Sequence, residues 1–201
     1  VIIDLTASEI VAGRYADFLN AGIHIVTPNK RANTMKQEYY DEIMSLTSDH
    51  RLHYLYETTV GAGLPLISTI KDLVQSGDEI LQIEGIFSGT LGYIFSALEK
   101  DKSFSDIVRT AFDMGYTEPD PRDDLSGMDV ARKILILARE IGLKMELDQV
   151  NLNAPLPDEM TKGTVDSFWE NLPSIDAEFE KRRAEAEAQG KVLRFMASLK
   201  D

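Results

Sequence analysis

The first 58 residues alternate strand-like runs with helical segments, and this alternation limits the possible folds more than any other feature. The strand-like runs cover residues 1–5, 23–27 and 53–58. Apolar residues at helical spacing cover residues 8–21, and a second helix is expected over residues 35–47. Strand, helix, strand and helix joined by short connections are typical of a doubly wound parallel sheet. Ligands bind in the loops after such strands.

The chain starts directly in an apolar run without a methionine, so we expect residue 1 to fall inside a domain. The rest of the chain has a less regular pattern. We expect helices over residues 65–76, from Ser88 to Leu98, from Ser103 to Met114, and over residues 128–141 and 173–189, and strands over residues 80–87, 145–150 and 191–198. Ser103 stands where a helix N-cap is expected, and Gly22 where a helix ends.

Composition narrows the class of protein. The formal net charge of −13 and the scattered basic residues argue against a nucleic-acid or anionic-membrane partner. The sequence has no cysteine, which removes thiolate chemistry, and its three histidines lack the spacing of a helical zinc site. It has neither an apolar run of membrane-spanning length nor a signal-peptide pattern, so we expect a cytoplasmic protein.

An acidic loop stands before the helix expected at residue 128. Its carboxylates are Glu118, Asp120, Asp123 and Asp124, and Arg122 is the one base among them. Helix capping needs one or two acids, so the excess predicts a cationic ligand. An ammonium group and a divalent metal remain equally open from the residues alone.

The helix expected over residues 128–141 has Asp129 and Lys133 four residues apart, hence on one face. Such a pair is either functional or an ordinary exposed ion pair. A helical wheel puts five polar residues on one arc: Asp129, Arg132, Lys133, Arg139 and Glu140. We therefore expect Arg139 to be a surface residue whose replacement does little. Ile136 lies in the middle of this arc, however, which suggests that something covers the face.

Four stretches together resemble the homoserine dehydrogenase family, most closely the dehydrogenase portion of bifunctional aspartokinase/homoserine dehydrogenases. They are residues 26–30 (VTPNK), 60–65 (VGAGLP), 86–91 (IFSGTL) and 115–133 (GYTEPDPRDDLSGMDVARK). The resemblance implies NAD(P)-dependent interconversion of L-homoserine and L-aspartate 4-semialdehyde, in threonine and methionine biosynthesis. The lack of cysteine agrees, because the neighbouring enzyme, aspartate-semialdehyde dehydrogenase, needs a cysteine nucleophile.

The resemblance also implies a role for individual residues. Lys133, Asp129 and Lys30 match catalytic positions, and Glu118, Tyr116 and Asp124 match substrate-binding positions. Thr6, Ser8, Asn29 and Lys30 match the nicotinamide side of an NADP or NAD site. Glu57 and the carbonyls of Val60, Ala62 and Leu64 match a monovalent-cation site, although spacing alone reads Gly61 and Gly63 as either a plain turn or an ion contact.

The implied fold is α/β: the C-terminal half of a Rossmann-type parallel sheet, then an α+β substrate-binding and dimerisation domain whose mixed sheet is covered by helices. We expect the first domain over residues 1–50 and the second over residues 51–201. No G-x-G-x-x-G motif occurs, so the expected chain is a fragment without the first βαβ unit. The alternative to the dehydrogenase is an inactive, dimerising, substrate-binding module. The implied partners are a small amino-acid substrate, a second copy of the chain and a linked aspartokinase domain.

Overall fold

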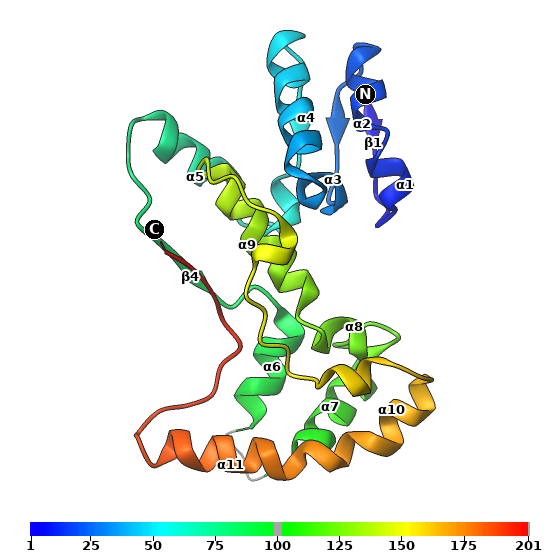
Figure 1. Ribbon diagram of the computed structural model, residues 1–201, viewed down its shortest axis with the longest axis vertical. Helices are drawn as coiled ribbons and strands as arrows, with labels where there is room; N and C mark the ends of the chain where they lie inside the picture. The colour runs from blue at the N-terminus through cyan, green and yellow to red at the C-terminus, as the bar shows by residue number, and fades with distance from the viewer. Residues whose placement is uncertain (99–101, 201) are drawn as a thin grey trace. The chain divides into compact units, whose positions relative to one another are not determined.

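The computed structural model describes residues 1–98 and 102–200 (Figure 1). Its internal contacts divide the chain into two compact units. The first unit contains Val1–Ile83, Ala131–Asn151 and the last residues from Ser198; the second contains Glu84–Val130 and Leu152–Ala197. These units are defined by contacts within each part and not by domain boundaries, so the domain boundary predicted at residue 50 stays a prediction.

A parallel sheet organises the first unit. Its strands are β1 (Ile2–Ile3), β2 (Ile25–Val26) and β3 (Tyr54–Leu55), in the order β1-β2-β3. Both pairs are parallel, with Ile2 opposite Ile25 and Ile25 opposite Tyr54. The predicted α/β class with a parallel sheet is therefore confirmed.

The helices of this unit differ from the predicted ones in their bounds. They are α1 (Glu9–Ala12), α2 (Tyr15–Asn20), α3 (Arg31–Thr34), α4 (Gln37–Asp49) and α5 (Leu66–Gln75), with 3₁₀ turns at Glu57–Thr59 and Leu147–Gln149. The predicted helix over residues 8–21 is two helices, because α1 ends at Gly13. Gly22 ends α2 as predicted: its φ of 74° is easily reached only by glycine, and its N–H donates to the Leu19 carbonyl. The strand predicted over residues 145–150 is wrong, since a 3₁₀ turn closed by Glu146 and Gln149 stands there.

Helices surround the core of the second unit. They are α6 (Gly89–Ala97), α7 (Phe104–Asp113), α8 (Pro121–Leu125), α10 (Val165–Asn171) and α11 (Asp176–Glu187), with 3₁₀ turns at Asp158–Thr161 and Leu172–Ile175. Ser103 caps α7 as predicted, and Ser88, where a helix was predicted to start, caps α6. The core is aromatic at its centre, where the rings of Phe104 and Phe179 stack 3.8 Å apart.

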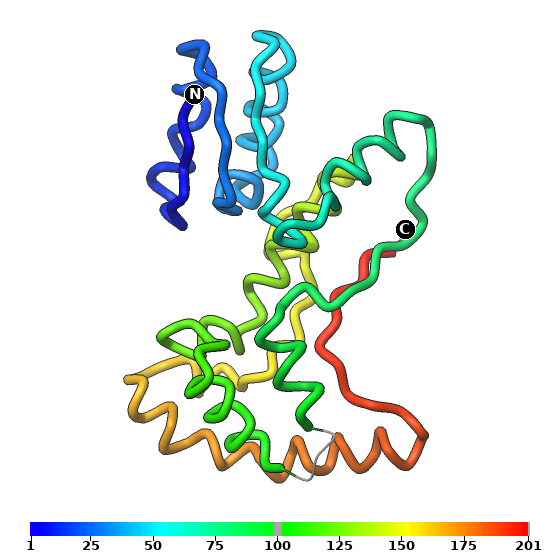
Figure 2. The backbone as a smooth tube through the Cα atoms, turned by 180° about the vertical axis from the view of Figure 1, so that it is seen from behind, coloured from blue at the N-terminus to red at the C-terminus, as the bar shows by residue number. Residues whose placement is uncertain are grey.

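A two-stranded sheet joins β4 (Gln82–Gly85) to β5 (Ala197–Lys200), whose traces run side by side in Figure 2. The strand predicted over residues 191–198 is therefore largely wrong: Lys191–Met196 has no regular structure, and the strand begins only at Ala197. Among the described residues, no helix is long and apolar enough to cross a membrane.

Helix α9 spans Met128–Glu140, and the prediction that Arg139 lies on its surface is wrong. The Arg139 side chain is completely buried. Its guanidinium donates to the carbonyl of Asn33 at 2.8 Å and to that of Met145 at 2.7 Å, and it lies 3.7 Å from the Glu146 carboxylate. The wheel misplaced Arg139 because it does not show what packs on a helix. The burial of Ile136 confirms that this face is covered.

We expect Arg139→Ala to lower the free energy of unfolding by about 3 kcal/mol, because it leaves buried carbonyls without donors and a carboxylate without its cation. Arg14→Ala is the matched control, since Arg14 is mostly exposed, forms a surface ion pair with Asp17 and lies over the Phe18 ring; its effect should be about 0.5 kcal/mol or less. Urea unfolding measures both. Equal effects of the two substitutions would contradict the structural role of Arg139.

Candidate active site

A buried polar network lies at the carboxyl ends of β1 and β2, where a parallel sheet binds ligands. Asp4 is its centre and is 4% exposed. Its carboxylate accepts hydrogen bonds from the Tyr15 hydroxyl, from the Asn29 amide at 3.0 Å, and from the backbone and hydroxyl of Thr6 at 2.8 and 2.7 Å. Thr27 completes the network by donating its hydroxyl to the Asp4 carbonyl. Hence one carboxylate orders the loops that follow both strands.

These bonds also set the protonation of the network. Burial by itself raises the pKa of Asp4, but the hydrogen bonds from Tyr15, Thr6 and Asn29 outweigh it and lower the pKa below its ordinary value. Burial, followed by the hydrogen bond to Asp4, raises the pKa of Tyr15 well above 10. Asp4 is therefore an anion and Tyr15 a neutral donor over the physiological pH range.

The network includes three of the four residues predicted for the nicotinamide site. Thr6 bonds to Asp4, Ser8 caps α1, and the Asn29 amide spans from Asp4 to the Ser8 carbonyl at 3.0 Å. Lys30 follows as the N-cap residue of α3. The structure thus brings the four together, and their contact with a cofactor stays a prediction. Sequence reasoning missed Asp4 and Tyr15; the signal was a single acid inside an apolar run.

The acidic loop lies in the second unit, and its carboxylates have different partners. Asp120 caps α8 and binds Arg122 through two nitrogens, Nε at 2.9 Å and Nη2 at 2.6 Å. This pairing with Arg122 lowers the pKa of Asp120. Asp124 accepts the backbone N–H of Glu118 at 2.7 Å, while Glu118 itself is exposed. Asp120 therefore shapes the loop, and Asp124 places Glu118 next to it.

Tyr116 is held at the start of this loop. Its carbonyl accepts the Thr90 hydroxyl at 2.6 Å, and its ring packs edge-on against that of Tyr93, 5.0 Å between centroids. Tyr116 is 47% exposed. Of the three residues predicted to bind substrate, Tyr116 and Glu118 thus lie on the loop before α8 and Asp124 lies in α8 itself, all in the second unit.

Helix α9 carries Asp129 and Lys133 one turn apart, about 6 Å along the axis. Gly127 fixes the entry to this helix. Its φ is 68°, and a Cβ there would lie 2.9 Å from both Leu152 and Phe195, so the position has no room for a side chain. Asp129 and Lys133 are both half-buried. The predicted spacing of the pair is therefore realised in a helix whose start is sterically fixed.

Glu57, predicted as a cation ligand, accepts the backbone N–H groups of Ile67 at 2.8 Å and Ser68 at 3.0 Å at the start of α5. The predicted carbonyl ligands come from a tight turn, in which Gly61 and Ala62 both have positive φ, 82° and 52°. No set of three or more His, Cys, Asp or Glu side chains among the described residues is placed to hold a metal ion.

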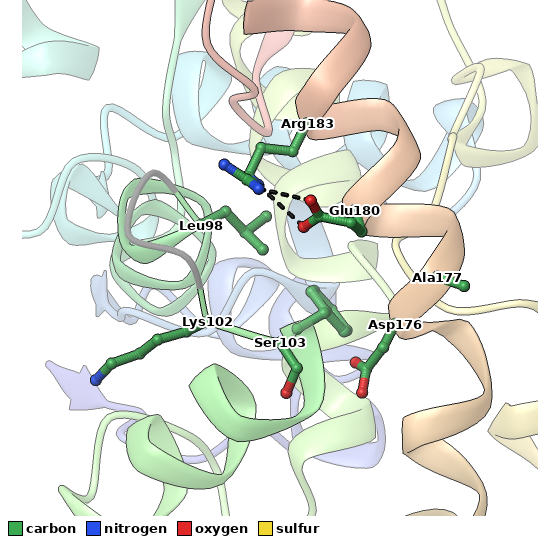
Figure 3. Close-up of a pocket in the computed structure, with 8 residues that line it drawn as sticks. Leu98, Lys102, Ser103, Asp176, Ala177, Glu180 and Arg183 are labelled. Atoms are coloured by element: carbon green, nitrogen blue, oxygen red, sulfur yellow. Dashed lines mark hydrogen bonds and ion pairs between the residues drawn. The ribbon is translucent and has the colours of Figure 1, made fainter.

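A hollow of about 430 Å³ in the second unit is separate from all of these residues (Figure 3). Ser103, Asp176, Glu180 and Arg183 line it, with Leu98 and Lys102 at its side. The Arg183 guanidinium is bound to the Glu180 carboxylate at 2.6 Å, and Asp176 accepts from Ser105. None of the residues predicted to bind substrate or cofactor lines this hollow.

Two models of known protein families match this chain, one at each end. Residues 1–57 match the model described as "Homoserine dehydrogenase, NAD binding domain", which agrees with the parallel sheet and identifies this part as an α/β nucleotide-binding fold. Residues 65–200 match the model described as "Homoserine dehydrogenase". The chain belongs to the homoserine dehydrogenase family, as its motifs predicted.

The most similar relatives include bifunctional enzymes. Bifunctional aspartokinase/homoserine dehydrogenase 2 of Zea mays is 49% identical, covering 99% of this chain and 22% of the relative. The Haemophilus influenzae bifunctional enzyme is 48% identical, covering 100% and 25%. Homoserine dehydrogenase of Schizosaccharomyces pombe is 45% identical, covering 98% and 54%. The chain spans about a quarter of the bifunctional relatives and about half of the fission-yeast protein.

Solved structures with a similar fold include members of the same family. A Candida auris protein of unknown function is 40% identical with a TM-score of 0.94, covering 98% of this chain and 57% of that one. A putative homoserine dehydrogenase of Archaeoglobus fulgidus is 26% identical with a TM-score of 0.76, covering 98% and 55%. A hyperthermophilic archaeal homoserine dehydrogenase in complex with NADPH is 28% identical with a TM-score of 0.62, covering 69% and 42%.

The Asp4 network predicts a pH dependence of stability. Because the folded-state pKa of Asp4 is lowered, its contribution is complete above the unfolded-state pKa and is lost as pH falls through the folded-state pKa. We expect Asp4→Asn to be less stable than wild type at neutral pH and to lose less stability between about pH 5 and pH 3. Urea unfolding across this range measures the slope. Tyr15→Phe, which removes one donor to Asp4, should give an intermediate slope, and an unchanged slope in Asp4→Asn would contradict the assignment.

Proposed function

We propose that the full-length protein containing this chain interconverts L-homoserine and L-aspartate 4-semialdehyde with NADP or NAD. The observation that carries the proposal is the end of the family motif over residues 115–133. There Asp129 and Lys133 lie one turn apart in α9, both half-buried, and Gly127 before them has no room for a side chain. Family models that match residues 1–57 and 65–200 support a dehydrogenase over a module that only binds substrate.

Lys133 is the proposed proton donor. When an aldehyde is reduced, its oxygen gains negative charge and then a proton, and a nearby ammonium group stabilises that charge and supplies the proton. Asp129, one turn away, is the proposed partner that keeps Lys133 charged and oriented. Lys30, next to the Asp4 network, is the second proposed catalytic lysine. In the oxidation direction the same groups accept the proton of the homoserine hydroxyl.

The residues at the carboxyl ends of β1 and β2 fit the nicotinamide half of the cofactor, because Thr6 and Lys30 flank loops that Asp4 holds rigidly. The cofactor supplies or accepts the hydride when bound. Glu118 and Asp124 are proposed to bind the ammonium group of the substrate, and Tyr116 to line the site. The NADPH bound to the archaeal relative supports NADP as one of the two cofactors.

We propose a monovalent cation at Glu57 and the carbonyls of Val60, Ala62 and Leu64. A carboxylate oxygen that accepts an N–H retains a second lone pair for a cation, so capping of α5 is compatible with the site. Sodium should raise the melting temperature of the full-length protein relative to choline at equal ionic strength, since a ligand bound to the folded state stabilises it. Glu57→Gln should remove the difference between the two ions. A wild-type protein that melts identically in both salts would exclude the site.

The remaining parts of the proposal concern assembly. We propose a cytoplasmic homodimer with a covalently linked aspartokinase domain, because two of the similar relatives are bifunctional by name. Light scattering of the full-length protein that showed only monomer at micromolar concentration would contradict the dimer.

The proposed roles rank substitutions in the full-length protein. Lys133→Ala should lower kcat by about 100-fold or more, the usual effect of a lost general acid. Glu118→Gln should raise the KM for homoserine about tenfold with little change in kcat, because it weakens one charged contact to the substrate. Steady-state kinetics and melting temperatures measure both.

Lys181→Ala is the control, because the Lys181 side chain is 76% exposed on α11 and forms a surface ion pair with Glu185. It should keep normal kinetics. Near-normal turnover of Lys133→Ala would refute the proposed chemistry, and equal effects of all three through lower stability alone would make the site structural.

A further inference from the structure

Two side chains connect α3 to α9 inside the first unit. Thr34, the last residue of α3, is 6% exposed. Its hydroxyl donates to the Lys30 carbonyl at 3.0 Å, with the Arg31 carbonyl at 3.3 Å as a longer alternative. The same oxygen accepts a hydrogen bond from Nη1 of Arg132 at 2.9 Å. The Thr34 hydroxyl therefore connects the start of α3 to Arg132, which lies 98 positions further along the sequence.

The connection ends at the two proposed catalytic lysines. Lys30 supplies the carbonyl at one end, and Arg132 at the other end is the neighbour of Lys133 in α9. The path from the backbone of Lys30 to that of Lys133 thus runs through the Thr34 hydroxyl, the Arg132 side chain and two hydrogen bonds. We call Thr34 and Arg132 the α3–α9 brace.

Helix α3 needs such a brace because it cannot hold its own position. It has four residues, too few for a helix that is stable by itself. Extended backbone at Met35 and Lys36 separates it from α4, so it is not the first turn of a longer helix. A second contact supports the same arrangement: Arg139, two turns after Arg132, donates to the carbonyl of Asn33 at 2.8 Å. Helix α9 therefore binds two consecutive residues of α3.

We propose that Thr34 and Arg132 are positioning residues that set the separation of Lys30 and Lys133. This inference rests on the proposed function, since the two lysines are catalytic only there. Arg132 binds Thr34 through its side chain, and Thr34 binds the backbone of Lys30, so each acts through another residue rather than on the substrate. Proton transfer requires a heavy-atom distance near 3 Å, and a misplacement of about 1 Å is enough to cost about 100-fold in rate.

The test uses the full-length protein and compares Thr34→Val, which has the same shape without the hydroxyl, with Thr34→Ser, which keeps the hydroxyl. Thr34→Val should lower kcat by about tenfold to 100-fold while the KM for homoserine changes less than about threefold. Thr34→Ser should keep kcat within about threefold of wild type. Arg132→Met should resemble Thr34→Val, and the double variant should be no slower than the slower single variant, because both remove the same connection.

Thr47→Val is the matched control. Thr47 also donates its hydroxyl to a carbonyl four residues earlier, that of Ile43 at 2.7 Å, but within α4 and far in sequence from either lysine. It should lower the melting temperature as Thr34→Val does without lowering kcat. If Thr34→Val does not fold, Arg132→Met compared with Arg132→Lys, which retains a donor, makes the same test.

The inference is wrong if Thr34→Val has the kcat of Thr47→Val, if Thr34→Ser is as slow as Thr34→Val, or if the losses of the single variants multiply in the double variant. Lys133→Ala in the same series separates this failure from failure of the proposed function. An inactive Lys133→Ala with a normal Thr34→Val removes only the brace, whereas an active Lys133→Ala removes the proposed function and the brace with it.

Discussion

The first unit depends on a permanent charge buried without contact to solvent. Burial lowers the pKa of Arg139, yet guanidinium remains charged, so its desolvation must be offset by partners. The carbonyls of Asn33 and Met145 and the Glu146 carboxylate are these partners. Asn33 belongs to α3, whereas Met145 and Glu146 belong to the segment that follows α9. The charge therefore determines where α3 and the segment after α9 lie against α9.

Asp4 fixes the loops at the edge of the parallel sheet, as Arg139 fixes the segments packed against α9. Asp4 is surrounded by neutral hydrogen-bonding groups, hydroxyls and amides, whereas Arg139 has both neutral carbonyls and the Glu146 carboxylate as partners. Neutral partners restrict direction as well as distance, whereas an opposite charge alone restricts distance. Loops held in this way need little reorganisation when a substrate is bound, which is the property that electrostatic catalysis requires.

Local signals predicted much of the fold. The alternation of strand and helix in residues 1–58, the N-cap Ser103 and the C-terminal Gly22 are visible in short stretches of sequence, and each was found there. The failures are those of long-range packing. The wheel showed Arg139 as polar and hence exposed. A strand was predicted over residues 145–150, where Glu146 instead caps a 3₁₀ helix and accepts the backbone N–H of Gln37.

The residues of the candidate site also divide into those that local sequence predicted and those that depend on long-range contacts. The 115–133 segment is one continuous motif, so the resemblance to a family was enough to predict roles for Glu118, Asp124, Asp129 and Lys133. The residues that fix Lys30 were not predicted, because Asp4, Tyr15 and Thr34 have nothing in their own surroundings that marks them: a lone acid, a helical tyrosine and a threonine at the end of a short helix. Their importance comes from partners 11, 25 and 98 positions away in the sequence. A motif therefore predicts which groups meet a ligand, while the groups that hold them in place are visible only after the chain has folded.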